Sequence, residues 1–109
     1  DRMSDAEINA AINDAEMYAS QDQFRRDTFT VLSEAGVLIG KVDNAMHNVP
    51  KDFDKDAKKR VKSDLEELRK LTTKMKPENM TESDLADVRG TMQRLQDSSE
   101  NLLRAAGIS

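Results

Sequence analysis

The side chains best suited to acid–base chemistry are two acidic pairs, Glu66 with Glu67 and Glu82 with Asp84. Two carboxylates can act as general acid and general base when both reach the same reacting group. Neighbours one or two apart on a helix point in different directions, so neither pair is expected to converge on a substrate. We therefore predict that this chain is not an enzyme.

His47 is the single histidine, and cysteine is absent. A metal site would require further ligands of these types, so no metal and no cofactor are predicted. His47 lies near an expected helix end, where partial positive charge is favourable, and capping or simple exposure is its expected role. Without cysteine the chain forms no disulfide, which permits a reducing compartment.

One basic cluster stands out, Lys58-Lys59-Arg60-Val61-Lys62. Acidic residues surround it and can pair with it along a helix, and the net charge is −4. A nucleic-acid site would need a broader basic face with aromatic neighbours, so no nucleic-acid partner is predicted. The longest apolar run, Ala35 to Ile39, is far shorter than a membrane span, so no membrane is predicted either.

The elements that must position these side chains are expected to be helices of one small domain. The chain has 109 residues, of which 35% are charged and 4% aromatic, and no segment alternates as a strand would. Residues 4–49 contain no proline and two glycines, and an unbroken helix over them would be close to 70 Å long. Such a helix must bend, or part of it must project onto something outside this chain.

The second half of this stretch, residues 28–49, has an apolar stripe at alternating steps of four and three. The first half begins with a capping signal, in which Ser4 caps Glu7 and the Glu7 carboxylate reaches back to the Ser4 amide. A thinner stripe then follows, and it loses its phase in the polar stretch 20–27. A bend or a solvated bridge is expected between Met17 and Asp22. The apolar face of this arm consists of Ile8, Ile12, Ala15 and Tyr18.

Two further helices are expected after Pro50, over residues 54–75 and 81–106. Asp52 or Asp54 caps the first, Thr81 with Asp84 caps the second, and Gly107 ends it. The fold class is therefore all-α, with an arm (1–27) leading into an antiparallel three-helix bundle (28–109). The predicted bundle core consists of Leu38, Val42, Val61, Leu65, Leu68, Val88, Met92 and Leu95.

Gly36 and Gly40 have the GxxxG spacing that allows helices to approach closely. Three interpretations stay open for this pair: close packing inside the bundle, a surface for self-association, or simple tolerance of glycine in a helix.

The run Met3-Ser4-Asp5-Ala6-Glu7-Ile8, followed by Asp14-Ala15-Glu16, Tyr18-Ala19 and Asp22, resembles the C-terminal helical lid of the 70-kDa heat-shock chaperone family (the DnaK family). The likeness continues through Glu34-Ala35 and Leu38-Ile39 to Val49-Pro50. It is specific from about Met3 to Met46, and beyond Pro50 it rests on helix lengths and loop positions.

This resemblance implies a helical arm and cap that close over an unfolded client peptide held by a separate β-subdomain. ATP would bind to another domain of the parent protein, since this chain has no Gly-rich phosphate loop. Asp22 matches a family Asp on the hinge side and is the best candidate for an interdomain contact. Ser33 stands where the family usually has Asn. Gly36, Gly40 and Asp43 stand where several members have side chains that latch onto the β-subdomain, so two latch side chains are missing.

The leading hypothesis is thus the lid of a chaperone in protein folding and the stress response, cytoplasmic or in the mitochondrial matrix. The chain begins at Asp1 instead of Met, and we expect a fragment of a larger protein. The alternative is a free-standing helical adaptor for protein–protein interaction. Under either hypothesis the apolar side of the arm lacks a cover, so a homodimer of the isolated chain is expected.

Overall fold

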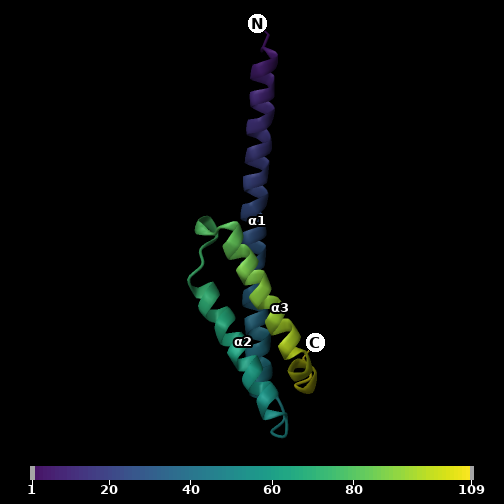
Figure 1. The fold of residues 1–109 in the computed structure, drawn as a ribbon. Coiled ribbons are helices and arrows are strands. Elements are labelled where there is room, and N and C mark those ends of the chain that lie inside the picture. The colour runs from purple at the N-terminus through teal and green to yellow at the C-terminus, as the bar shows by residue number, and fades with distance from the viewer. Residues whose placement is uncertain (1, 109) are drawn as a thin grey trace.

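The structure is a computed structural model that describes residues 2–108, and it is all-α as expected. The helices are α1 (Asp5–Asn48), α2 (Lys55–Thr73) and α3 (Glu82–Ala105), and a short 3-10 turn, η1 (Pro77–Asn79), lies between α2 and α3. No strand occurs among residues 2–108. The second half of α1 forms an antiparallel bundle with α2 and α3, while its first half projects alone, so the molecule measures 77 × 23 × 16 Å (Figure 1).

α1 passes from Met17 to Asp22 as one unbroken helix of 44 residues, so the expectation of a bend there is wrong. The alternative, a solvated bridge, describes this stretch, because its backbone is helical and its side chains are mostly exposed. No glycine or proline interrupts α1 before Gly36. Two bonds between residues four apart support the polar part: Arg26 to Asp22 at 2.6 Å and Gln23 to Asp27 at 2.8 Å.

The helix starts follow the local signals, with one correction. The Ser4 side chain accepts a hydrogen bond from the Glu7 amide at 3.1 Å. The Glu7 carboxylate, however, accepts from the Ser4 hydroxyl and not from the Ser4 amide. Asp54, not Asp52, caps α2 by accepting from the Ala57 amide. At α3 both halves of the capping box between Thr81 and Asp84 are present.

The ends of the later helices also follow from the chain. α2 ends at Thr73, two residues before the expected end, and the hydroxyls of Thr72 and Thr73 bond to main-chain carbonyls of its last turns. Lys76, just before Pro77, is extended, as a residue that precedes proline prefers. After α3, Gly107 has φ +73°, the left-handed conformation expected at a helix stop.

The core lies where the three stripes meet, and every predicted core residue is buried there. Burial along α1 begins at Thr28, which is fully buried, while Phe24 packs against the edge of the core. Two ion pairs cross between helices on the surface: Arg69 with Asp43 joins α2 to α1, and Arg94 with Glu67 joins α3 to α2, each at 2.9 Å. The bundle thus has a core of its own, and the arm contributes almost nothing to it.

Candidate docking surface

The most unusual feature of the molecule is a long exposed face on α1, apolar except at Asp22, Arg26 and Ser33, that no other element of residues 2–108 covers. α2 and α3 pack on the opposite side of the helix. Ser33 and Val42 show the geometry: they are nine residues apart, which is two and a half turns, so they point in opposite directions. Val42 is fully buried and Ser33 is exposed. We call the exposed side the outer face, and it consists of Ile8, Ile12, Ala15, Ala19, Asp22, Arg26, Phe29, Ser33, Gly36 and Gly40.

The arm supplies the first half of this face. Ile8 is 42% exposed and Ile12 is 50% exposed, which is unusual for isoleucine. Ala15 is also exposed, and Tyr18, at the edge of the face, is 71% exposed. All four predicted residues of the arm's apolar face therefore lie in solvent in this structure, along the projecting helix at the top of Figure 1. An uncovered apolar face of this kind is a candidate docking surface.

The outer face continues past the arm onto the back of the bundle, which the sequence analysis missed. Phe29, and Val37 at the edge of the face beside Gly36, are each 69% exposed, although the neighbouring residues Thr28 and Leu38 are buried. The signal that could have revealed this continuation is a second set of alternating steps of four and three, which runs from Ile8 to Gly40 half a turn away from the core stripe. The polar residues of stretch 20–27 concealed it.

Gly36 and Gly40 lie on the outer face and not between helices. A Cβ added to either glycine would meet nothing within 4 Å. The interpretation of close packing inside the bundle is therefore wrong, because no neighbouring helix approaches them. The two glycines leave an unfilled strip of bare backbone on the exposed side of α1.

The two carboxylates singled out by the resemblance are already engaged within the chain. Asp22 is on the outer face and pairs with Arg26 of the same helix, while the side chain stays 43% exposed. Asp43 lies beside the bundle, and Arg69 of α2 holds its carboxylate. Asp22 is thus accessible to a partner, whereas Asp43 is committed to an intramolecular contact.

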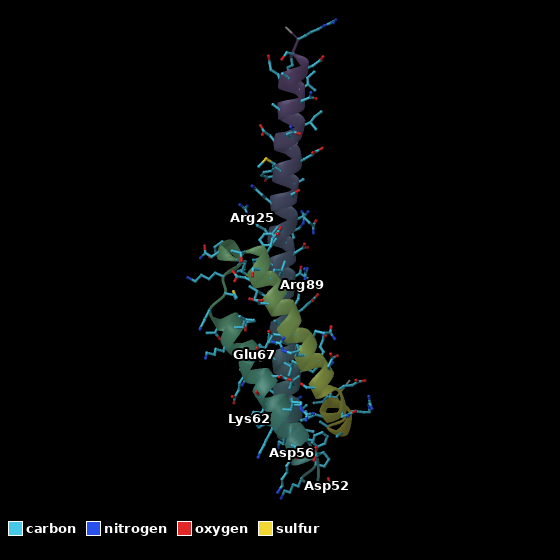
Figure 2. The ribbon with its side chains drawn as sticks, viewed as in Figure 1. Arg25, Asp52, Asp56, Lys62, Glu67 and Arg89 are labelled. Atoms are coloured by element: carbon cyan, nitrogen blue, oxygen red, sulfur yellow. The ribbon has the colours of Figure 1, made fainter. Side chains whose placement is uncertain are left out.

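The remaining polar side chains that could do chemistry are dispersed. Glu67 pairs with Arg94, Asp84 caps the Thr81 amide, and His47 lies 2.7 Å from the Asp43 carbonyl oxygen. Figure 2 shows Lys62 and Asp56 on α2 and Asp52 in the loop before it, so acidic and basic groups are interspersed at this end. Within residues 2–108 no three potential metal ligands gather, and no helix has both the length and the apolar composition needed to cross a membrane.

A shallow groove runs between α1 and the end of α3. Its floor is apolar, with Leu38, Leu103 and Ile108, and its rim carries Lys41 and Arg104. Arg104 is bonded to Glu100 on its own helix. The groove brings together no acid, base or nucleophile in a catalytic arrangement, and the outer face stays the best candidate for function.

Comparison with known proteins finds similarity to a heat shock protein. The chain is 31% identical over 72 residues to the mitochondrial heat shock protein SSC3 of Saccharomyces cerevisiae, an alignment that covers 66% of this chain and 11% of the yeast protein. No family model matches the chain, and no solved structure matches it significantly. The chain spans about a tenth of the length of this relative. The similarity supports a relationship to the heat-shock chaperones.

Proposed function

We propose that this chain is the helical lid of an ATP-dependent protein-folding chaperone. The lid would close over an unfolded peptide held by a neighbouring β-subdomain and slow the release of that peptide. The observation that carries this proposal is the outer face of α1. It is long, largely apolar and uncovered, and none of its residues belongs to the core of the bundle. The similarity to the yeast heat shock protein agrees with this role.

The mechanism would be gating by a rigid cover. In this proposal the arm and the back of the bundle rest on the β-subdomain through Ile8, Ile12 and Phe29, and Asp22 contributes a polar interdomain contact. The lid itself would supply no catalytic group and bind no cofactor. ATP would act through a separate nucleotide-binding domain of the parent protein, which would be cytoplasmic or, in a eukaryotic organelle, located in the mitochondrial matrix.

The absence of two latch side chains would affect how tightly the proposed lid closes on the β-subdomain. Gly36 and Gly40 offer no hydrogen bond to a facing loop, and Asp43 is held by Arg69. Closure would therefore depend on apolar contact, whose strength scales with the area removed from water. We expect a lid that responds weakly to salt and strongly to loss of Phe29 or Val37.

The test is the rate at which a labelled peptide leaves the full-length parent protein. Truncation after Asp22 should speed release, and Phe29→Asp with Val37→Asp should speed it in the same direction. Ser63→Asp is the matched control, because Ser63 is exposed on α2 and away from the outer face. Equal release rates for the truncated and intact proteins would refute the lid function.

A further inference from the structure

The outer face carries a pattern more specific than exposure alone. Its ten positions recur at strictly alternating steps of four and three from Ile8 to Gly40. This is the a/d spacing of a coiled coil, in which each helix inserts side chains between those of a second helix. The bundle side of α1 uses a separate stripe. One helix thus presents two coiled-coil seams, and within residues 2–108 only the seam that faces the bundle is occupied.

The seam is complementary to itself when a second copy runs in the opposite direction. In an antiparallel coiled coil, a positions lie level with d positions of the other helix. If Asp22 lies level with Arg26 of the second copy, each of the remaining four layers pairs a larger side chain of one copy with a smaller one of the other. From the centre outward these layers are Phe29 with Ala19, Ser33 with Ala15, Ile12 with Gly36 and Ile8 with Gly40.

The layers that contain Gly36 and Gly40 show the closest fit in size and spacing between the two copies. Ile8 and Ile12 are four residues apart, as are Gly36 and Gly40, and the open space at both glycines leaves room for a side chain from outside. The arm therefore carries two knobs and the bundle end carries two holes at the same spacing. A partner without such knobs would leave the glycines uncovered.

Charge selects the direction of the pairing. Asp22 and Arg26 are the charged positions of the seam, and in an antiparallel pair each Asp22 meets an Arg26 of the second copy. In a parallel pair Asp22 would meet Asp22 and Arg26 would meet Arg26, which is unfavourable. Both side chains are accessible, with 43% of Asp22 and 63% of Arg26 exposed. The next layer outward would bring Asp5 against Asp43, so the pairing ends at Ile8.

We propose that two copies of this chain associate as an antiparallel homodimer through the outer face of α1, with Asp22 of each copy beside Arg26 of the other. The two-fold axis of the dimer passes between the two α1 helices at the level of Phe24. Each bundle lies on the side away from the second copy, because α2 and α3 cover the opposite side of α1. The pairing does not rest on the lid function, but it uses the same surface, so a lid closed on its own parent could not pair in this way.

The first test exchanges charges at the centre. Asp22→Arg alone and Arg26→Asp alone each create like-charged layers, and the dissociation constant of each should rise about tenfold or more. An equimolar mixture of the two variants restores opposite charges in both central layers and should form a heterodimer. Sedimentation velocity of each protein and of the mixture measures this. Ser63→Asp, on the exposed side of α2, should leave the dissociation constant unchanged.

The second test uses the absence of native cysteine. Ala15→Cys and Ser33→Cys lie in one layer of the proposed dimer, so a mixture of the two variants should form a disulfide-linked heterodimer. Within either variant alone the two cysteines would be 18 residues apart along the axis, which is about 27 Å, so neither should crosslink with itself. Crosslinking of Ala15→Cys with itself would show a parallel pair and overturn the proposal.

Three results would contradict the antiparallel dimer. The first is a wild-type chain that stays monomeric at millimolar concentration. The second is a single charge variant that dimerises as well as wild type. The third is an equimolar mixture of Asp22→Arg and Arg26→Asp that does not associate. Circular dichroism with thermal melting provides the fold control, because every substituted residue lies outside the core. A wild-type chain that is folded but monomeric would refute the dimer and would mean that a different protein covers the outer face. The peptide-release test of the lid does not depend on this result.

Discussion

The guanidinium of Arg69 on α2 lies 2.9 Å from the carboxylate of Asp43 on α1, and this pair ties the last turns of α1 to the bundle. Both side chains are nearly half exposed, so water and salt weaken the attraction. We expect Asp43→Asn to lower the free energy of unfolding by about 0.2–1 kcal/mol at low ionic strength. Urea unfolding in low and high salt measures it. A double-mutant cycle with Arg69→Met that gives no coupling energy would contradict the pair.

Ser99 is fully buried on α3, and its hydroxyl has no hydrogen-bond partner. An unpaired buried hydroxyl is costly, and alanine has the higher helix propensity. Ser99→Ala should therefore raise the free energy of unfolding by about 1 kcal/mol. Ser98→Ala is the control, because Ser98 is only half-buried and its hydroxyl bonds to the Leu95 carbonyl. Destabilisation by Ser99→Ala in urea unfolding would show that the hydroxyl has a partner in solution.

The arm and the bundle should respond differently to the loss of apolar side chains. Leu68 is fully buried, and Leu68→Ala should cost about 2–5 kcal/mol through lost contacts and the cavity left behind. Ile12→Ala should change the stability of the bundle by less than about 0.5 kcal/mol, because Ile12 is half exposed on the arm. The comparison is made by chemical denaturation at a concentration where the chain is monomeric. A large effect of Ile12→Ala would show that the arm packs on its own bundle.

The glycines should separate into two types. Gly36 is helical with open space around its Cβ position, so Gly36→Ala should stabilise the monomer by about 0.5–1 kcal/mol. Gly107 has φ +73°, where a Cβ is strained, so Gly107→Ala should destabilise it by a similar amount. Thermal melts of the two variants provide the measurement. Destabilisation by Gly36→Ala would mean that a neighbour approaches this glycine in solution.

The two N-terminal caps should differ in their effect on global unfolding. Thr81 caps a helix of the bundle, and Thr81→Ala should cost about 1 kcal/mol. Ser4 caps the arm, far from the core, so Ser4→Ala should increase fraying of the first turn and leave the unfolding of the bundle unchanged. Hydrogen exchange of amides 5–12 reports the fraying, and a urea midpoint reports the bundle. Equal shifts in the midpoint would show that arm and bundle unfold together.

Much of the fold could be predicted from the sequence, because helical periodicity and capping are local properties. The three stripes, the caps at Asp54 and Thr81 and the stop at Gly107 each depend on residues within a few positions of one another. The bend was predicted wrongly because the polar stretch between Ser20 and Asp27 was interpreted as a break. Its side chains instead bond to each other along a continuous helix.

The candidate surface was predicted only in part. The arm's apolar residues were identified from their spacing, but the sequence analysis assigned no role to Phe29 or Val37, and Gly36 and Gly40 were given packing as one interpretation. Which side of α1 these residues occupy depends on where α2 and α3 pack, and that is a tertiary property. Once the core side is fixed by Val42, Phe29 and Val37 must lie outside.

Because α1 is continuous, the arm and the bundle move as one lever. No joint exists between Asp5 and Asn48 at which the bundle could swing independently of the arm. In the proposed lid, a rotation of about 10° at the N-terminal end of α1 would carry the far tip of the 77 Å molecule through roughly 13 Å. A small change of angle at one end is thereby converted into a displacement larger than the diameter of a helix.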